Sequence, residues 1–498
     1  MHLLITIILL LVCGIYVFIG FLSSRGVRKT EQFLPVDSGR TYVRNGKEFA
    51  ASTVATSISM ATVVLAIFEL YPYLRLWLLW PVLTTAAGLI LVRFCATRIW
   101  DRVCGDGGSI RLSLHDFLGK TYGTKSITLV AASATTLGFL GVLAVELTVA
   151  SKFLSRFGPS AIPGFAWLLI IAAVLLVYVA AGGYRAVIVT DRIQMGTIVG
   201  FLVAGTLMVV ALMTSKSGND TAGTTLSGEG NRALFPVADG FTSFMIGILI
   251  INVPAALSDM SVWMRVAASE NRKAVTDGLA SSALGAAATW TWIVVLALCA
   301  FLLFGTPESE HPLFVLLNGT LNVGSTYADV LVLVAIVGLF GAALSTGSTQ
   351  VMAAVHALYR DILGNLRPVG ENNRLAGEEG LLGVRAALIV LLVFAVVVVE
   401  GLNRLGFSIA DLVFAIYGAQ LSLFPPVVLA LFSRSKSLRS SALPALLAVI
   451  FGFVGGWASA IIGKIIGNAD MVFLAPAVSL FGSVIVLFGG RILMSKKE

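Results

Sequence analysis

Four hydroxyl side chains crowd into six residues of a helix that is otherwise apolar. The run Leu344–Thr349 reads LSTGST and lies inside an apolar stretch from about residue 326 to 363. A helix that only faced lipid would have no use for these groups, whereas hydroxyl and carbonyl oxygens are the hard ligands that an alkali cation needs once it sheds water. Transporters gather such oxygens near the bilayer midplane, where a broken helix frees its carbonyls. The run therefore predicts a cation site.

Two other apolar stretches are interrupted by polar residues at matched positions. One interruption is Ala55–Ser59 (ATSIS), and the other is Asn252–Asp259 (NVPAALSD), where Pro254 lacks a backbone donor. They lie five helices apart, which predicts a core of five plus five helices related as an inverted repeat, with the site at the two breaks. The alternative is that Ser, Thr and Pro merely kink these helices, as they often do in membranes.

Polar side chains inside the other apolar stretches have a structural and a functional interpretation each. Glu146 lies deep in AVELTVASKFL, so it must pair, protonate or line a wet cavity, and a hydroxyl partner is slightly favoured. Asp191 either caps a helix and opposes a neighbouring arginine or has a functional role, as acids inside the membrane usually do, and both interpretations stay open. Gln420 precedes a kink at Pro425-Pro426 and is a weaker candidate for a substrate cavity.

Cysteine and histidine spacing gives no sign of a metal centre. The four cysteines are scattered, and three lie in or beside apolar stretches, where a free thiol behaves as a small hydrophobe. His356, near one end of its helix, could carry a proton, but a structural histidine with satisfied nitrogens is the favoured interpretation.

The composition of the chain is that of a membrane protein. The 498 residues are 57% hydrophobic and 12% charged, with a mean hydropathy of +0.94, whereas soluble domains are about 25% charged. We predict an all-α polytopic membrane protein that forms one transmembrane domain over residues 1–498, with an additional helix at 1–22, a ten-helix core at 48–432 and two final helices at 440–494. The thirteen apolar stretches long enough to span lie near residues 2–22, 48–68, 73–96, 127–154, 161–182, 187–213, 239–264, 274–304, 326–360, 381–402, 406–432, 440–463 and 471–494.

The net charge of +8 does not indicate a nucleic-acid partner, because the basic residues follow the membrane topology. When the loops are assigned alternately to two sides, most of the 34 lysines and arginines fall on one side. The positive-inside rule then predicts an external amino terminus and a cytoplasmic carboxyl terminus in the cell (inner) membrane. The expected partners are the lipid bilayer and a small polar solute, and the sequence does not give the oligomeric state.

Three stretches resemble one known family. Residues 181–194 read AGGYRAVIVTDRIQ and are similar to the signature of the sodium:solute symporter family; residues 49–59 (FAASTVATSIS) resemble its broken first core helix, and residues 341–363 (GAALSTGSTQVMAAVHALYRDIL) resemble its eighth. The thirteen stretches and their orientation also fit, so the resemblance covers the chain. It implies a sodium-coupled symporter with broken first and sixth core helices, working by alternating access, with Na+ as the coupling ion.

The resemblance also implies which residues bind sodium. The backbone carbonyls of Ala55 and Ile58 would face the carbonyl of Ala342 and the hydroxyls of Ser345 and Thr346. Asp191 would be a way-station for sodium leaving inward. Ser348 and Thr349, in contrast, are interpreted as hydroxyls that can bond back within their own helix.

The solute is indicated by residues 259–265, which read DMSVWMR. The spacing of Asp259, Trp263 and Arg265 resembles the urea-transporter branch of the family, although Met260 and Met264 replace glutamines of that branch. Asp259 and Trp263 are one helical turn apart, so an acceptor and an aromatic platform could both contact a small planar donor. In the alternative, Trp263 fills the core and Asp259 pairs with a basic side chain. The candidate substrate contacts are Thr56, Ser57, Glu146, Asp259, Trp263 and Gln420.

The sequence therefore predicts sodium-driven import of a small polar solute, with urea or a small amide or amine as the first candidate. The alternatives are import of an amino acid or a monocarboxylate by the same fold, or a transporter-like membrane sensor working with a separate kinase. A channel would require a pore-loop filter, and none is recognisable. No catalytic constellation indicates an enzyme.

Overall fold

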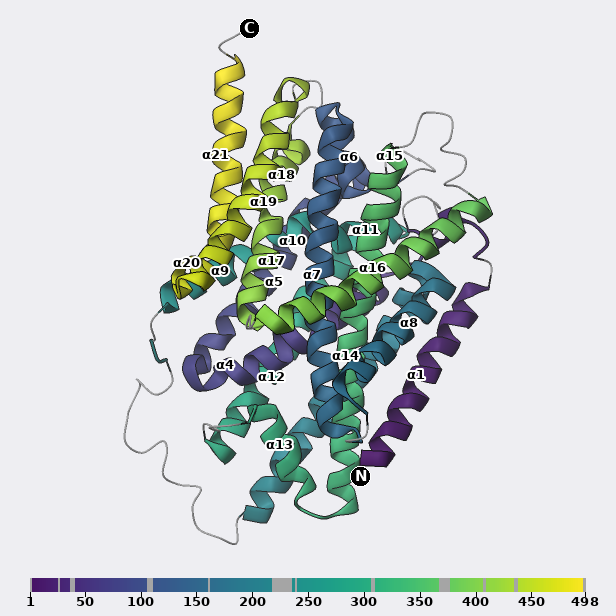
Figure 1. Cartoon of the computed structure of the whole chain (residues 1–498), viewed down its shortest axis with the longest axis vertical. Helices are drawn as coiled ribbons and strands as arrows, with labels where there is room; N and C mark the ends of the chain where they lie inside the picture. The colour runs from purple at the N-terminus through teal and green to yellow at the C-terminus, as the bar shows by residue number, and fades with distance from the viewer. Residues whose placement is uncertain are drawn as a thin grey trace.

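The computed structural model describes residues 2–25, 27–35, 41–104, 111–159, 162–216, 235–237, 240–305, 310–366, 377–405, 409–433 and 438–495. Within these ranges the chain is helical, apart from turns and one isolated parallel bridge between Val43 and Ser269. In Figure 1, α1 begins in the lower part of the molecule and α21 ends at the top, so the start of the first helix and the end of the last lie far apart.

The helices of the first half are α1 (His2–Ser24), α2 (Thr30–Phe33), α3 (Gly46–Ser57), the π-helix η1 (Met60–Leu65), α4 (Ala66–Leu74), the 3₁₀ turn η2 (Arg75–Leu78), α5 (Leu79–Cys104), α6 (Leu114–Tyr122), α7 (Lys125–Phe157) and α8 (Gly164–Lys216). Those of the middle are α9 (Phe241–Asn252), α10 (Ala255–Ser258), α11 (Met260–Ala268), α12 (Arg272–Phe304), α13 (Pro312–Leu321), α14 (Thr326–Val355), the π-helix η4 (His356–Leu363) and α15 (Gly364–Leu366). The last part contains α16 (Gly377–Leu405), α17 (Ile409–Gln420), η6 (Leu421–Leu423), α18 (Phe424–Phe432), η8 (Arg439–Ser441), α19 (Ala442–Ile465), α20 (Ala469–Phe473) and α21 (Ala475–Ser495).

Eleven helical segments of the described residues are long and apolar enough to cross a membrane. Two of them, Val63–Cys104 with 42 residues and Gly164–Ser215 with 52 residues, are each long enough for two crossings, since a spanning helix needs only about 20 residues. These two segments account for the difference from the thirteen predicted stretches, and the predicted all-helical membrane fold is confirmed. Two short helices, α6 and α13, lie between the predicted apolar stretches.

α8 bends sharply where the sequence predicted two separate helices. Gly183 has φ +58° and ψ −148° inside an otherwise regular helix, a conformation that L side chains rarely adopt. A Cβ atom at this position would lie 2.7 Å from the carbonyl oxygen of Phe33. The kink therefore depends on glycine, and it sets the direction of the part of α8 that carries Asp191.

We expect Gly183→Ala to lower the free energy of unfolding by about 1–3 kcal/mol, the usual cost of one strained backbone position. Gly196→Ala is the matched control, because Gly196 lies in the same helix with no atom within 4 Å of an added Cβ, and alanine there should stabilise by roughly 0.5–1 kcal/mol. Thermal unfolding of the two purified proteins gives the comparison. Equal midpoints would show that the kink does not depend on glycine.

Both predicted helix breaks are present. α3 ends at Ser57, and Ile58 has φ −92° and ψ 71° before η1 begins at Met60. α9 ends at Asn252, one turn (α10) follows, and Asp259 has extended backbone before α11 begins. The first and sixth helices of the predicted core are therefore broken as expected.

The two broken helices are joined to each other by backbone hydrogen bonds. The amides of Tyr42 and Val43, before α3, donate to the carbonyl of Ala268 at 2.9 and 3.1 Å. The amide of Glu270, after α11, donates to the carbonyl of Val43 at 3.0 Å. The start of one broken helix is thus attached to the end of the other.

The most enclosed apolar segments are α7 and α14 with η4, which lie in the middle of the bundle in Figure 1. Glycines on α14 allow α8 to pack closely: a Cβ on Gly338 would lie 2.4 Å from the carbonyl oxygen of Thr197. Close approach through small residues is the usual way in which membrane helices pack. Every residue from Gly338 to Ala357 is buried, so the hydroxyls of Leu344–Thr349 face protein and not lipid.

Candidate functional site

The hydroxyls of α14 lie against the last turn of α3. Thr346 Oγ1 donates to the carbonyl oxygen of Thr56 at 3.1 Å. That carbonyl belongs to the final turn of a helix, where backbone acceptors lose their intrahelical partners. The predicted meeting of α14 with the break in α3 is therefore present.

The residues predicted to bind sodium are all buried around this contact. Ala55, Ile58 and Ser345 have no exposed surface, and Ala342 and Thr346 are 1% exposed. Ala342 lies three and four residues before the two hydroxyl-bearing residues, so all three share one face of α14. The group offers only oxygen ligands, which suits a hard monovalent cation.

The other two hydroxyls of the LSTGST run differ from each other. Ser348 Oγ donates back to the carbonyl of Ser345 at 3.1 Å, as expected for a hydroxyl satisfied within its own helix. Thr349 Oγ1 instead lies 3.2 Å from Thr56 Oγ1 and 3.4 Å from Arg265 Nη2, so it contacts both broken helices. The expectation of back-bonding was wrong for Thr349.

Asp191 lies between α3 and α14. Its carboxylate accepts from Ser52 Oγ at 2.5 Å and from Ser345 Oγ at 2.9 Å, and the side chain has no exposed surface. It does not cap a helix, because α8 continues on both sides of it, and the neighbouring Arg192 pairs with Glu48 at 3.0 Å. The capping interpretation is therefore excluded, and a carboxylate beside the predicted sodium ligands is what an ion path would need.

Arg265 holds α11, α3 and α14 together, a role that the sequence interpretation missed. The side chain is 3% exposed. Its Nη2 donates to Thr56 Oγ1 at 2.6 Å, and its Nε donates to Ser52 Oγ at 3.1 Å, the same hydroxyl that donates to Asp191. A guanidinium inside a short apolar helix was the signal that could have indicated this role, because intramembrane charges usually have a partner.

A cavity of about 260 Å³ lies between the two breaks. Its polar wall includes the predicted substrate contacts Thr56, Ser57, Asp259 and Gln420, together with Arg265. Apolar side chains form much of the rest of the wall, among them Leu89, Phe244, Ile251, Val413 and Phe414. A mostly apolar cavity with a few convergent polar groups is the usual form of a small-molecule site.

Asp259 faces this cavity from the start of α11. Its Oδ1 accepts from the amide of Ser261 at 2.7 Å, which caps the helix. The carboxylate also contacts the Ser261 hydroxyl and the Val262 amide and interacts electrostatically with Arg265, although no salt bridge within 4 Å is found among the described residues.

Trp263 lies outside the cavity wall. Its indole nitrogen donates to the carbonyl of Leu257 at 2.8 Å, and its ring lies 5.3 Å from the ring of Phe117 on α6. The side chain is 1% exposed. One helical turn separates Trp263 from Asp259, but the indole packs in the bundle core, so the pair does not form the expected acceptor and platform.

Glu146 also lies outside the cavity wall, at the break in the first helix. Its carboxylate accepts from Ser59 Oγ at 2.6 Å, from the amide of Met60 at 2.8 Å and from the amide of Ala61 at 3.4 Å. These amides begin η1, where backbone donors have no intrahelical partner. Glu146 therefore caps the second half of the broken helix, in agreement with the structural interpretation.

We expect Glu146→Gln to lower the free energy of unfolding by about 1–3 kcal/mol, because the carboxamide offers one acceptor where three donors meet. Ser59→Ala removes only one of these bonds and should cost roughly 0.5–1.5 kcal/mol. Denaturation of both variants in detergent provides the comparison. A Glu146→Gln protein as stable as the unmodified chain would argue that the carboxylate is kept for a purpose other than the cap.

Solved membrane transporters resemble this structure over nearly its whole length. A Na+-coupled sialic acid symporter in a substrate-bound, outward-open state aligns with a TM-score of 0.69 at 16% sequence identity, covering 97% of this chain and 96% of that one. A manganese transporter of Eremococcus coleocola aligns with a TM-score of 0.53 at 14% identity, covering 91% of this chain and 98% of that one. The sequence itself matches no family model and no curated protein. The chain therefore has the helical fold of these two membrane transporters.

Proposed function

We propose that the chain is a sodium-coupled symporter of the sodium:solute type that imports a small polar solute by alternating access. The observation that carries the proposal is the group of buried oxygens where α3, α8 and α14 meet, directly beside the cavity. Thr346 reaches the last turn of α3, and Asp191 accepts from hydroxyls of α3 and α14. Thr346 and Thr56 also line the cavity, so an ion at the break and a solute in the cavity would contact the same two helices.

The proposed sodium site comprises the carbonyls of Ala55, Ile58 and Ala342 and the hydroxyls of Ser345 and Thr346. Asp191 is the proposed acceptor for sodium leaving this site. We also propose that the amino terminus is external, and that the chain consists of an additional first helix, a ten-helix core and two final helices.

The solute is proposed to be small and to carry hydrogen-bond donors. The cavity volume of about 260 Å³ is slightly smaller than the usual volume of ligand pockets, which is roughly 300–1,000 Å³. Asp259 supplies a carboxylate acceptor in its wall, and Thr56, Ser57 and Gln420 are further proposed contacts. Urea and small amides are the first compounds to test, ahead of amino acids and monocarboxylates.

Thermal unfolding of the purified chain in sodium, potassium and N-methylglucamine chlorides at one ionic strength tests the ion. Sodium at 100 times its dissociation constant should stabilise by about 2.7 kcal/mol, whereas the other cations should not. Equal midpoints in the three salts would contradict sodium coupling. Uptake into liposomes of labelled urea, acetamide, amino acids and monocarboxylates, with and without a sodium gradient, then identifies the solute.

We expect Ser345→Ala or Thr346→Ala to weaken the apparent sodium affinity roughly 5- to 150-fold, as one lost contact of 1–3 kcal/mol requires. Ser348→Ala is the matched control, because the Ser348 hydroxyl contacts the Ser345 carbonyl and the Tyr178 hydroxyl and is not among the proposed ligands. The midpoint of sodium-dependent stabilisation measures all three variants. Sodium dependence that is unchanged in both test variants would remove the site from this position.

A further inference from the structure

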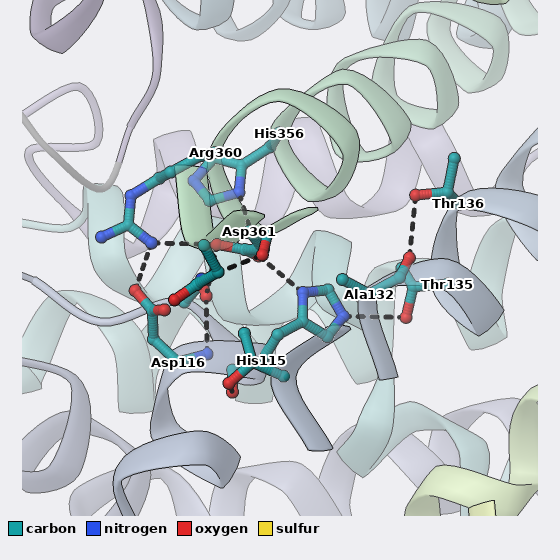
Figure 2. A network of polar contacts seen from close by, with 11 residues as sticks. His115, Asp116, Ala132, Thr135, Thr136, His356, Arg360 and Asp361 are labelled. Atoms are coloured by element: carbon teal, nitrogen blue, oxygen red, sulfur yellow. Dashed lines mark hydrogen bonds and ion pairs between the residues drawn. The ribbon is translucent and has the colours of Figure 1, made fainter. Parts of the chain in front are cut away.

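A second buried polar cluster lies away from the cavity, where α6 meets the end of α14 (Figure 2). At its centre is Asp361 on the π-helix η4. One carboxylate oxygen accepts from Ser113 Oγ at 3.0 Å, and the other lies 2.6 Å from Nδ1 of His115 on α6. Asp361, His115 and His356 have no exposed surface, and none of them lines the cavity.

The two histidines of this cluster are held differently. His115 has a partner for each ring nitrogen, because Nδ1 contacts Asp361 and Nε2 lies 2.9 Å from Thr135 Oγ1. A neutral ring satisfies both contacts, with Nδ1–H donating and Nε2 accepting from the threonine hydroxyl. His356 has no hydrogen-bond partner at either nitrogen, and its Nδ1 lies 3.7 Å from Asp361 Oδ2. The expected satisfied histidine is thus His115 and not His356.

The charges of the cluster do not balance when both rings are neutral. In the contacts of the described residues, Arg360 Nη1 pairs with Asp116 on α6 and lies 2.9 Å from Asp361 Oδ1, which sets one cation against these two carboxylates. An uncompensated buried charge is costly. A proton on His356 would bring these four side chains to neutrality, and both ring nitrogens would then carry a hydrogen, so that Nδ1 donates to Asp361 in either ring orientation.

The other ionisable groups on the elements packed against η4 and α6 are engaged elsewhere or lie at a distance. On α7 and α16, Glu146 caps η1, Arg385 donates to the Ala180 carbonyl, and Lys125, Glu378 and Glu379 are exposed. The Tyr359 hydroxyl packs against Gly383 of α16. On α6, Tyr122 donates to the Pro426 carbonyl, Lys120 is exposed, and Arg439 of η8 lies beside Gly123 at its far end. On α5, Asp101 pairs with Arg272 and Arg102 donates to the Ser433 carbonyl. Among the described residues, His356 is therefore the group placed to take up the missing proton.

We propose that His356 is a proton-binding site, and that its protonation fastens the end of α14 to α6 through Asp361. Imidazole is the side chain suited to exchange a proton near neutral pH, and Asp361 Oδ2, 3.7 Å from Nδ1, is the acceptor nearest to a protonated ring. π-Helical turns such as η4 are frequent at functional sites. This site is separate from the proposed sodium site and does not depend on symport.

Titration of the histidine ring signals by NMR in the full-length protein, labelled with ¹⁵N-histidine, tests proton binding. The chain has four histidines, so His356→Gln identifies the signal by its disappearance. We expect the His356 ring signal to change with pH, and Asp361→Asn to weaken its proton affinity at least tenfold. Asp116→Asn removes one of the two carboxylates near Arg360, so Arg360 then compensates the charge of Asp361. This variant should shift the His356 midpoint in the same direction. It takes the place of Asp361→Asn if Asp361→Asn does not fold.

His311 is the internal control. Its Nε2 lies 3.1 Å from the Leu65 carbonyl, its Nδ1 accepts from the amide of Leu313, and burial lowers its pKa. Its midpoint should be the same in every cluster variant. A His356 ring that stays neutral down to pH 5, or a midpoint unchanged by both aspartate substitutions, would overturn the proposal.

Hydrogen exchange tests the fastening. At pH 6 the amides of α6 should exchange faster in His356→Gln than in the unmodified chain, and at pH 8.5 the two proteins should exchange alike. Comparison at one pH removes the intrinsic pH dependence of exchange. Equal exchange at pH 6 would refute the link between the proton and α6.

Discussion

Replacing Arg265 by leucine is expected to lower the free energy of unfolding by about 3–5 kcal/mol, the usual cost of leaving a buried charge without its partner. The charge left behind would be that of Asp191, which is fully buried, shares the Ser52 hydroxyl with Arg265 and interacts electrostatically with it. Arg265→Lys should cost less, because the positive charge remains although the forked contacts to α3 are lost. Thermal or chemical denaturation of the purified proteins measures the effect.

The double variant Arg265→Leu, Asp191→Asn separates charge from packing. It removes both ions, so it should recover at least half of the stability lost in Arg265→Leu. If the double variant is no more stable than the single one, Arg265 acts through its contacts to Ser52, Thr56 and Thr349 and not as the counter-charge of Asp191.

Asp259→Asn is expected to abolish sodium-driven uptake while sodium-dependent stabilisation remains. The amide oxygen of asparagine can still accept from Ser261 and keep α11 capped, so the substitution removes the charge that faces the cavity and its electrostatic interaction with Arg265. Uptake into liposomes and the sodium-dependent unfolding midpoint are measured on the same preparation.

Two controls accompany this experiment. Asp259→Ala also removes the cap and should cost about 1 kcal/mol of stability, which separates a folding defect from a transport defect. Trp263→Phe keeps an aromatic ring in the core beside Phe117, and uptake should survive because the indole lies outside the cavity wall. Normal uptake by Asp259→Asn would make Asp259 a capping residue only and would remove the main argument for urea.

Local chemistry was enough to predict the helices, their breaks and the hydroxyl run. Proline, serine and threonine at Asn252–Asp259 and Ala55–Ser59 reveal a break because they act on the backbone next to them. The helix kink at Gly183 was predicted only as a gap between helices, because its conformation depends on contact with Phe33.

Contacts between distant parts of the chain could not be predicted from spacing. Arg265 and Ser52 are far apart in sequence, and only the packing of α11 on α3 brings them together. The spacing of Asp259 and Trp263 correctly predicted that the two residues lie one helical turn apart. It did not predict the direction of the indole, which packs against Phe117 of α6. The sequence identified Glu146 as a buried acid but not its partners. These include the Met60 amide, which is a free donor only because the first core helix is broken before it.

The backbone bridge between Val43 and Ser269 has a mechanical consequence. It ties the beginning of α3 to the end of α11, and Arg265 joins the same helices again at Ser52 and Thr56. Two helices that are joined at two positions cannot tilt independently. A rotation of α3 about Ile58 would therefore move α11 as well. The proposed ion ligands on α3 and the proposed solute contact on α11 therefore belong to one moving part. One movement can then depend on the binding of both an ion and a solute. Coupling the transport of a solute to the gradient of an ion requires such a shared movement.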